Sequence, residues 1–477
     1  MGNKLKIFSL CLIIGVNQFA GVVVARSAEF QNPNLVKISS DPYTDSLGQH
    51  ETEVEPDAYA FDSTIVSAFQ VGRNFYGGGS NIGWATSQDS GQTWKKGFLP
   101  GITKVASGPF DTVSDASVTY DAAHDSWIIS SLPLLLTRDD EDSGLLISRS
   151  TDGGLSWQDP INTHLGARLD KNWVRCDNNR SSRFFGRCYM VYDDPNGLIL
   201  LVSSNDGGLT WSNPIFSPDS VSGEGVEIGI QPNGTLIVTM GGFSDDSIKE
   251  IISSDGGTTF GKSNFISTGS FKVIPGFRSP VLPSTSVDAD GVIYTVWSDC
   301  RFETHCTSND VVLIKSNDGQ NWSQLMRLPL HLIGSGSDHF NPVISLDPTS
   351  RSPNARLFVT YYYLLDNKCK DEACEIHIAS TFSNDGGLHW TPPMELADPM
   401  KPDWIPPTSQ GLMLGDYFGS VFVQGQAFPF VTVAKPKNGK NFDQAIYTLK
   451  GGLTVGNSHD DVITMPSELW SEDLSKK

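Results

Sequence analysis

The sequence lacks any long hydrophobic run beyond its first 25 residues. After that point no segment approaches the roughly 18 apolar residues of a membrane-spanning helix, so we expect no membrane insertion of the mature chain. The first 25 residues are typical of an export signal: Lys4 and Lys6 precede an apolar run over 7–16, and small residues favour cleavage after Ala25. The sequence therefore predicts a protein secreted to an extracellular or periplasmic compartment.

Positive charge is scarce. The chain has 34 Lys and Arg against 54 Asp and Glu, a formal net charge of −20, without an acidic tail. Because nucleic acids and anionic membrane surfaces attract basic proteins, this charge argues against both as partners. The chain also has no phosphate-binding loop, no dinucleotide fingerprint and no zinc motif, so we expect neither a cofactor nor a metal.

Cysteine is rare, with seven residues in the whole chain. Cys11 lies in the export signal, and the other six fall into three pairs that are close in sequence: Cys176 and Cys188, Cys300 and Cys306, Cys369 and Cys374. A metal site is the alternative to disulfides, but there is no Cys-x-x-Cys pair and no nearby His cluster. We therefore expect three local disulfides, which form in the oxidising compartments that exported proteins reach.

One short motif, Ser-x-Asp-x-Gly-x-(Thr/Ser)-Trp, is abundant. Its six copies are 49 to 67 residues apart and contain, in order, Asp89, Asp152, Asp206, Asp255, Asp318 and Asp385. The Asp of each copy is suited to accept hydrogen bonds from backbone N–H groups of its own turn, and the Gly permits the positive φ that closes it. We interpret these aspartates as scaffold. A unit repeated at this spacing is typical of a solenoid or a propeller.

Strand-like segments precede each copy of the motif, for example 226–231 and 235–240. Together they predict four-stranded antiparallel units whose edges are protected when the units close into a ring. Counting strands gives seven units, because the last one over 419–449 lacks the motif and residues near 35–50 can supply its outer strand. The predicted fold is an all-β propeller with seven blades favoured over six, formed by residues 26–477 as a single domain.

The repeats resemble the Asp boxes of sialidases and of the wider superfamily of glycosidases, lyases and binding proteins with bacterial neuraminidase (BNR) repeats. The resemblance covers nearly the whole mature chain and implies a glycan or glycoconjugate partner, but it concerns the scaffold more than the chemistry. Sialidases use a tyrosine nucleophile with an activating glutamate, an aspartate acid/base and three arginines that clamp the substrate carboxylate. Their Arg-Ile-Pro-type motif near the mature start is absent here, so the arginine triad does not carry over residue by residue.

Propeller topology locates the candidate site. The motif turns lie on one face of the ring, whereas the starts of the inner strands converge on the opposite face around the axis. Candidate catalytic residues at these positions are Asp170, Glu227, His339, Asp416 and Tyr417. Candidate substrate-binding residues are Arg73, Lys171, Trp173, Arg278 and Arg301. Further acids in the predicted ring are Glu53, Asp57, Asp115, Asp193 and Glu224.

The sequence favours a secreted glycan-active hydrolase, an exo-acting, sialidase-like glycosidase that cleaves terminal sugars. One alternative is a polysaccharide lyase, with His339 or Tyr417 as base and Arg278 neutralising a uronate. The other is a non-catalytic propeller that binds a glycan or a protein. A deep axial cavity favours the enzyme, and a flat surface with paired acids favours the binder. The acidic run over 139–142 is interpreted as a solvated loop, with a calcium contact as its alternative.

Overall fold

The computed structural model describes residues 34–135, 144–163, 166, 168–370 and 373–455. The predicted export signal with Cys11 and the acidic run over 139–142 lie outside the described residues. The described chain is almost entirely β-structure, and its named helical elements are the short 3-10 turns Lys104–Ala106, Thr304–Cys306 and Pro402–Trp404. None of the described helical segments has the length and apolar character needed to cross a membrane.

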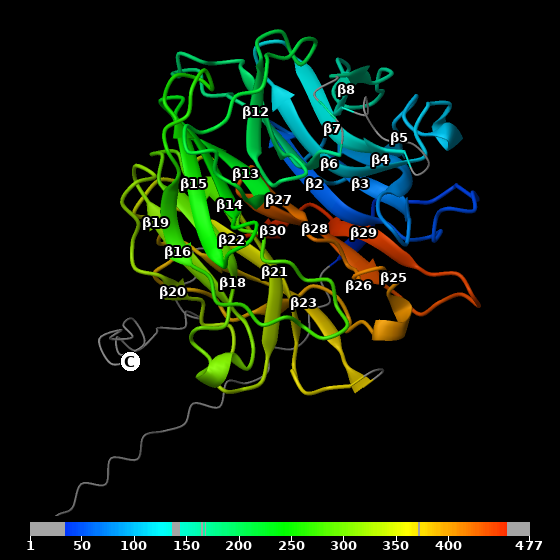
Figure 1. The fold of residues 1–477 in the computed structure, drawn as a ribbon. Helices are drawn as coiled ribbons and strands as arrows, with labels where there is room; N and C mark the ends of the chain where they lie inside the picture. The colour runs from blue at the N-terminus through cyan, green and yellow to red at the C-terminus, as the bar shows by residue number, and fades with distance from the viewer. Residues whose placement is uncertain (1–33, 136–143, 164–165, 167, 371–372, 456–477) are drawn as a thin grey trace, which may run out of the picture. The chain divides into compact units, whose positions relative to one another are not determined.

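The sheets are grouped around a common centre (Figure 1). Strands β2 (Val54–Phe61), β13 (Glu224–Ile230) and β27 (Gly419–Val423) lie near the middle, and later strands such as β8 (Leu146–Ser150) and β20 (Met326–Arg327) lie toward the outside. Small antiparallel sheets arranged radially in this way form a β-propeller. The predicted all-β propeller class is therefore confirmed.

Consecutive strands pair antiparallel within each sheet. The first sheet holds β2, β3 (Thr64–Arg73), β4 (Gly79–Ser87), β5 (Lys95–Phe98), β6 (Thr112–Asp121), β7 (Ser126–Leu134), β8 and β9 (Ile161–Asn162). A second holds β10 (Asp170–Cys176), β11 (Cys188–Asp193) and β12 (Ile199–Ser204). A third holds β13, β14 (Leu236–Gly241), β15 (Ser247–Ser253) and β16 (Asn264–Thr268).

The remaining strands continue this pattern. One sheet holds β17 (Ser284–Val287), β18 (Ile293–Asp299), β19 (Asp310–Ser316) and β20. The next holds β21 (Asp338–Leu346), β22 (Leu357–Leu364), β23 (Ile376–Ser383) and β24 (Met394–Glu395), and a small pair follows with β25 (Pro407–Thr408) and β26 (Gly411–Leu412). The last holds β27, β28 (Gln426–Ala434), β29 (Gln444–Leu449), β30 (Leu453–Thr454) and β1 (Leu35–Lys37).

The prediction of seven separate blades is wrong, because only five sheets of the described residues have four or more strands. Two repeats merge into one eight-stranded sheet, since β4 pairs with β6 through Gly79 and Val113. The sheet of β10–β12 stops at three strands, because the segment after its motif turn makes only isolated bridges, Ile215 with Leu201 and Ser222 with Leu198.

The two ends of the described chain meet in the last sheet. Leu35 pairs with Leu449 and Lys37 with Tyr447, so β1 is the outer neighbour of β29. This confirms that residues near the predicted start of the mature chain supply a strand to the final repeat. The pairing joins the first and last parts of the propeller by backbone hydrogen bonds and protects an edge that is otherwise open.

The motif turns are built as expected. At Asp152, the Oδ1 atom accepts hydrogen bonds from the backbone N–H groups of Leu155 and Ser156, both at 3.0 Å, and from the Ser150 hydroxyl at 2.7 Å. The Ser156 hydroxyl donates to Oδ2 at 2.6 Å. Equivalent hydrogen bonds to backbone N–H groups recur at Asp89, Asp206, Asp255, Asp318 and Asp385.

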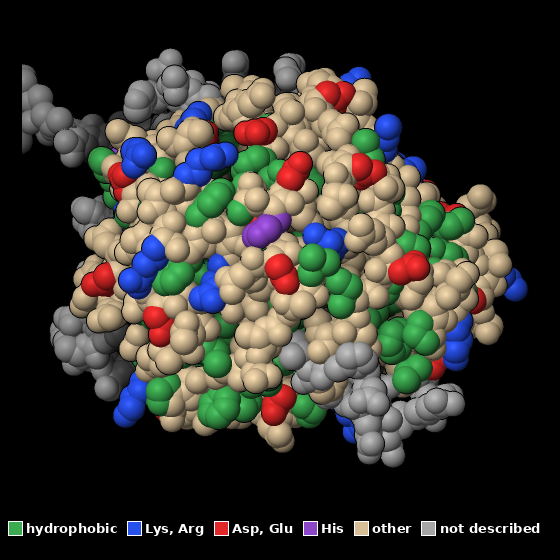
Figure 2. Space-filling view, turned by 90° about the horizontal axis from the view of Figure 1, so that it is seen from above, with side chains coloured by type: hydrophobic (Ala, Val, Ile, Leu, Met, Phe, Trp, Pro, Cys, Tyr) green, Lys and Arg blue, Asp and Glu red, His purple; other side chains and the backbone are tan. Residues whose placement is uncertain are grey.

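Hydrophobic side chains are buried mainly between neighbouring sheets. Trp173 and Tyr189, for example, pack with Val226 and Met240 across the contact between the β10–β12 and β13–β16 sheets. Figure 2 shows the face seen from above Figure 1, where acidic and basic side chains are scattered and hydrophobic side chains appear in small groups. The excess of negative charge is therefore not gathered into one patch on this face.

Candidate functional site

A cavity of about 690 Å³, which we call the upper cavity, lies over the starts of the inner strands. Its wall includes Asp115 from β6, Asp170 and Lys171 from β10, and Asp416 and Tyr417 just before β27. Other charged side chains that line it are Glu55, Arg73, Arg168, Asp193, Glu224 and Arg278. Six of the ten predicted catalytic or substrate-binding residues thus share one cavity: Arg73, Asp170, Lys171, Arg278, Asp416 and Tyr417.

A recurring backbone irregularity shapes this cavity. Five inner strands have a shift of register near their starts, and each shift contains a residue with positive φ. These residues are Glu55, Asp115, Lys171, Gly225 and Asn341, with φ of 54°, 49°, 41°, 64° and 47°. A bulge redirects side chains and is frequent beside active sites, and a positive φ at a non-Gly residue costs conformational energy. The strand starts are therefore strained where they meet at the axis.

Asp170 and Asp115 form a pair of neighbouring carboxyls. Burial, the charge of Asp115 and a hydrogen bond to Asp115 together raise the pKa of Asp170 to about 7. Two carboxyls that share a site cannot both ionise easily, so one proton remains between them near neutral pH. Asp170 is thus suited to donate a proton to a bound molecule.

Asp416 has the opposite environment. The Arg278 Nε atom donates to both carboxylate oxygens of Asp416, at 2.8 and 2.9 Å, and Nη2 makes a further contact with Oδ2. Burial lowers the pKa of Arg278, but the charge of Asp416 outweighs this and raises it, so the ion pair persists. Glu55 accepts a hydrogen bond from the Asp416 backbone N–H at 3.1 Å, and burial, followed by the charge of Asp416, raises the pKa of Glu55 to about 8.

Arg73 is held by the scaffold. Its guanidinium donates to the carbonyl oxygens of Asn74 and Gly78, at 2.8 and 2.9 Å, and contacts the Met413 Sδ atom at 3.2 Å. Burial lowers its pKa. Its donors therefore serve mainly to fix the loop that follows β3.

Lys171 and Tyr417 form the floor of the cavity, and Trp173 packs beneath them. The Lys171 Nζ atom lies 3.8 Å from the ring centroid of Trp173 and 3.7 Å from that of Tyr417, so both rings share the cation. Burial raises the pKa of Tyr417 well above its usual value, and its hydroxyl contacts the Ala116 carbonyl at 3.5 Å. Tyr417 is therefore neutral and lacks the activation that a nucleophile needs.

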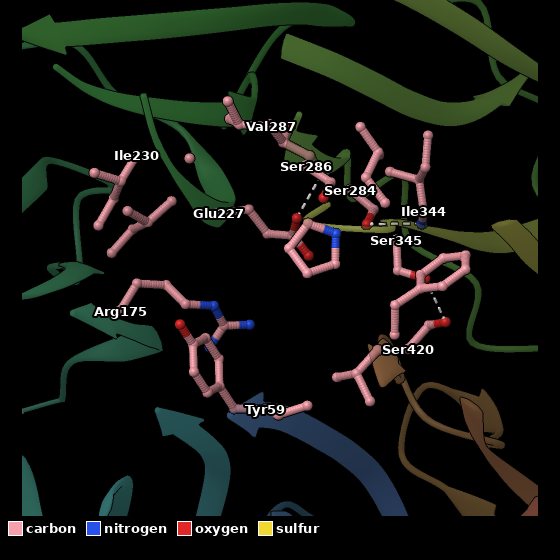
Figure 3. Close-up of a pocket in the computed structure, with 18 of the residues that line it drawn as sticks. Tyr59, Arg175, Glu227, Ile230, Ser284, Ser286, Val287, Ile344, Ser345 and Ser420 are labelled. Carbon is pink, nitrogen blue, oxygen red and sulfur yellow. Dashed lines mark hydrogen bonds between the residues drawn. The ribbon is translucent and has the colours of Figure 1, made fainter. Parts of the chain in front are cut away.

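A second cavity, of about 540 Å³, lies at the other ends of the inner strands (Figure 3). Glu227 and Trp173 line it, together with Tyr59, Arg175 and the hydroxyls of Ser284, Ser286, Ser345 and Ser420. Arg175 is paired with Asp57 at 3.1 Å. Glu227 accepts a hydrogen bond from the Thr285 backbone N–H, and burial raises its pKa to about 7. Glu227 on β13 and Trp173 on β10 thus line the second cavity and do not line the first.

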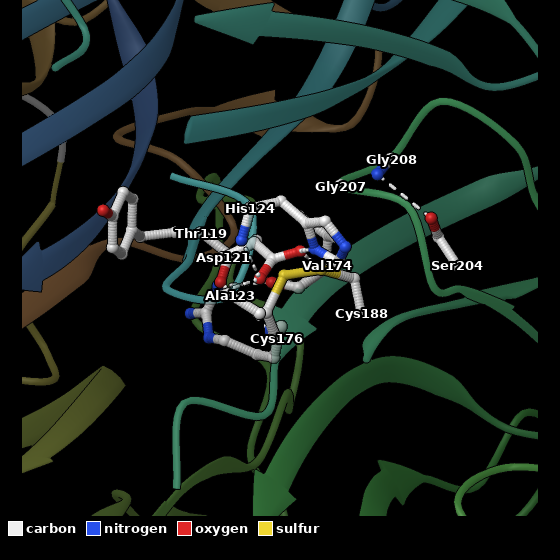
Figure 4. Close-up of a disulfide and its surroundings, with 12 residues drawn as sticks. Thr119, Asp121, Ala123, His124, Val174, Cys176, Cys188, Ser204, Gly207 and Gly208 are labelled. Carbon is white, nitrogen blue, oxygen red and sulfur yellow. Dashed lines mark hydrogen bonds and ion pairs between the residues drawn. A yellow bond between two sulfur atoms is a disulfide. The ribbon is translucent and has the colours of Figure 1, made fainter. Parts of the chain in front are cut away.

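The three predicted disulfides are confirmed: Cys176–Cys188, Cys300–Cys306 and Cys369–Cys374. The first joins directly opposite residues at the end of β10 and the start of β11, beside Asp121 and His124 (Figure 4). Asp121 with these two cysteines is the one group of described side chains close enough to hold a metal ion. Because both sulfurs are bonded to each other, the group does not offer thiolate ligands.

The structure does not bring two predicted residues to either cavity. His339 is buried beside Tyr361 and Tyr363, and its ring nitrogens contact the Asn309 carbonyl at 2.8 Å and the His331 ring at 2.9 Å. Burial and then His331 lower its pKa to about 3. Arg301 is instead bound to Asp299, with its Nε atom 2.9 Å from Oδ1.

Sequence reasoning also missed residues that do line the first cavity. Glu55 was overlooked in favour of Glu53, which is buried against Ser39 instead. The bulge in β21 places its positive-φ residue at Asn341, two positions after His339. No signal in a single sequence marks these bulges, because the residues at them are of mixed type.

No protein-family model matches the chain, and no curated protein matches it. Among solved structures, the chain is similar to the Hadza microbial sialidase Hz136, with 16% identity and a TM-score of 0.47. The match covers 66% of this chain and 64% of the sialidase chain, so this chain spans less than two thirds of the sialidase's length. The chain is also similar to an ulvan lyase of polysaccharide lyase family PL25, with 12% identity and a TM-score of 0.48. This match covers 89% of this chain and 98% of the lyase chain. A third similar structure is the NanB sialidase of Streptococcus pneumoniae, with 13% identity and a TM-score of 0.41. This match covers 88% of this chain and 71% of the NanB chain.

Proposed function

We propose that the upper cavity is the active site of a glycan-active hydrolase that cleaves a terminal sugar from a glycan or glycoconjugate. The observation that carries this proposal is the contrast between two carboxyls in one cavity. Burial and the neighbouring Asp115 raise the pKa of Asp170 to about 7, whereas Asp416 is ion-paired with Arg278. Acid-catalysed cleavage of a glycosidic bond needs one carboxyl that can donate a proton and a second that can stabilise positive charge.

Each residue has a stated role in the proposed reaction. Asp170 donates its proton to the glycosidic oxygen, so that the leaving alcohol departs neutral while the bond to the anomeric carbon breaks. The Asp416 carboxylate stabilises the positive charge that develops on the sugar ring. Water then adds to the anomeric carbon and gives up a proton to the Asp170 carboxylate, which restores the acid. Asp115 faces Asp170 and keeps its pKa high until the proton is transferred.

The arginines of this cavity are not arranged to bind the carboxylate of a sialic acid substrate. A sialidase clamps a substrate carboxylate with three arginines. Here Arg73 donates to backbone carbonyls, Arg278 is paired with Asp416, and Arg301 does not line the cavity. We therefore propose a glycosidase of sialidase-like architecture without assigning sialic acid as its substrate.

The lyase alternative needs a base that removes a proton next to a uronate carboxylate. His339 does not line the cavity, and burial keeps Tyr417 protonated. Neither predicted base is thus available in the geometry described, which favours hydrolysis over elimination.

A panel of 4-methylumbelliferyl glycosides tests the proposal. We expect the purified protein to release the fluorophore from at least one of them. Asp170→Asn and Asp416→Asn should each lower kcat by about 100-fold or more. Asp398→Asn, which alters an exposed acid outside both cavities, should leave kcat unchanged. Failure to cleave any glycoside by a folded protein that still binds glycans would identify a binding module instead.

We also propose that residues 1–25 direct export and that residues 26–477 form the mature propeller domain. Three disulfides among the described residues support an oxidising compartment. Amino-terminal sequencing of protein recovered outside the cytoplasm should begin just after Ala25. A chain that retains Met1 in that fraction would contradict cleavage.

A further inference from the structure

We propose that the sugar bound in the upper cavity carries a protonated amine, and that the next sugar of the substrate lies on an aromatic rim at the cavity mouth. This inference rests on the proposed function only in taking the cavity as a glycan site. It is carried by an acidic corner in which one buried carboxyl oxygen has no hydrogen-bond partner among the described residues, and by exposed aromatic side chains that line the same cavity.

The acidic corner consists of Asp170, Asp193 and Glu224. Asp170 and Asp193 are directly opposite each other in the β10–β11 pairing, and Glu224 begins the neighbouring inner strand. All three line the cavity. Burial and repulsion from neighbouring carboxylates raise the pKa values of Asp170 and Asp193 to about 7 and about 8, and a cation bound between them would offset that repulsion and favour their ionised forms.

Asp193 is the most buried carboxyl of this corner. The side chain is 4% exposed, and its Oδ1 atom accepts no hydrogen bond within the described part of the chain. Burial raises its pKa to about 8, followed by the charges of Asp170, Asp115, Glu224 and Asp194, and no cation contributes. A buried acceptor that faces a cavity without a donor is a site for a ligand donor.

The chemistry of the corner favours an ammonium group over a metal ion. No three carboxyl groups of this cavity, within the described residues, have oxygens close enough to one another to form a metal-binding group. An ammonium presents three N–H donors in different directions, so it can reach acceptors that do not converge on one point. The protein as a whole has a net charge of −20, which attracts cationic glycans and repels polyanionic ones.

The aromatic rim consists of Tyr76 and Phe243, which line the cavity although they are 79% and 45% exposed; the aliphatic Val273, 68% exposed, also lines it. Tyr76 is supported edge-on by Phe75, with ring centroids 5.0 Å apart. The Phe243 ring lies over Gly197, where an added Cβ would come within 2.5 Å of it. Rings that are supported from below but open above offer flat surfaces against which a sugar can stack.

Binding of two trimers of equal length tests the inference: β-1,4-linked glucosamine and its fully N-acetylated counterpart, measured by calorimetry at pH 6.5. We expect the glucosamine trimer to bind at least about tenfold more tightly, because only it carries ammonium groups. Glu224→Gln and Asp193→Asn should each reduce that preference, and Asp398→Asn, at an exposed acid outside both cavities, should leave it unchanged. Equal affinity for both trimers, or tighter binding of sialyllactose, would overturn the proposal.

The rim is tested with the same two trimers. Tyr76→Ala and Phe243→Ala should weaken both about fivefold or more, since stacking does not depend on the amine. Phe265→Ala removes an aromatic side chain that is 60% exposed but does not line the cavity, and should change neither affinity. Hydrolysis of glycosides without preference for the amine would contradict this inference but leave the proposed function standing. Selective binding of the glucosamine trimer without any hydrolysis would support this inference but contradict the proposed function.

Discussion

At the scale of single residues, the motif turns each depend on one carboxylate. Asp152 accepts three hydrogen bonds at Oδ1 and one at Oδ2. Its carboxylate thus satisfies two backbone N–H groups and two serine hydroxyls of the turn, which otherwise need water as a partner. Asp152→Ala should lower the free energy of unfolding by about 1–3 kcal/mol, because the turn loses its acceptors. Asp152→Asn keeps one acceptor oxygen and should cost less. Urea unfolding measures both, and an unchanged midpoint for the alanine variant would contradict the scaffold role.

These turns could be predicted from the sequence because the hydrogen bonds to their aspartates lie within seven residues. The environment of a carboxyl in the cavity could not, since it depends on partners that are far apart in the chain. Arg278 and Asp416, for example, are separated by 138 positions. The sequence identified the residue types at the axis, but which of them pair and which keep a proton follows only from the assembled ring.

At the scale of elements, the bulges at the inner strand starts decide which side chains reach the cavity. A regular strand alternates between two faces, and this alternation predicts sites from sequence. A bulge adds one residue and reverses the alternation beyond it. This is why Glu55 lines the cavity instead of Glu53, and why His339 is buried away from it while Asn341 occupies the bulge.

The bulge of β13 can be tested at Gly225. Its φ is +64°, and an added Cβ would come within 2.3 Å of the Leu282 side chain. Gly225→Ala should therefore destabilise the protein by about 1–3 kcal/mol and disturb Glu224 beside it. Gly261→Ala is the matched control, because its φ is not positive and the nearest atom to its Cβ lies at 3.7 Å. Equal melting temperatures for the two variants would contradict strain at the bulge.

At the scale of the whole molecule, buried carboxyls link stability to pH. Burial is the main cause that raises the pKa of Glu53, Glu55, Asp193 and Glu250 to about 8 each. Between the unfolded pKa values of about 4 and the folded values near 8, the folded state binds more protons than the unfolded state. The free energy of unfolding therefore falls as pH rises through this window.

Thermal unfolding should show this directly, with a higher melting temperature at pH 5 than at pH 8. Glu250→Gln removes one of the buried carboxyls at a position outside both cavities. It should therefore reduce the difference in the free energy of unfolding between pH 5 and pH 8 by on the order of 1 kcal/mol or more, and leave glycoside hydrolysis unchanged. A melting temperature that peaks at pH 8 would contradict the assigned protonation states.

The ring as a whole was predictable because its unit repeats, whereas the number of separate sheets was not. A single pairing, Gly79 with Val113, joins two repeats into one sheet, and nothing local marks those two residues as partners. Closure was predictable in outline, since the last repeat lacked a strand that residues near Leu35 were able to supply.

The pH dependence of kcat/KM tests the central claim most directly. The general acid must be protonated to act, so the rate should be constant below the pKa of Asp170 and fall tenfold per pH unit above about 7. With a 2,4-dinitrophenyl glycoside, whose leaving group needs no proton, Asp170→Asn should retain most of the activity and lose that falling limb. A falling limb that persists unchanged in Asp170→Asn would show that another group supplies the proton.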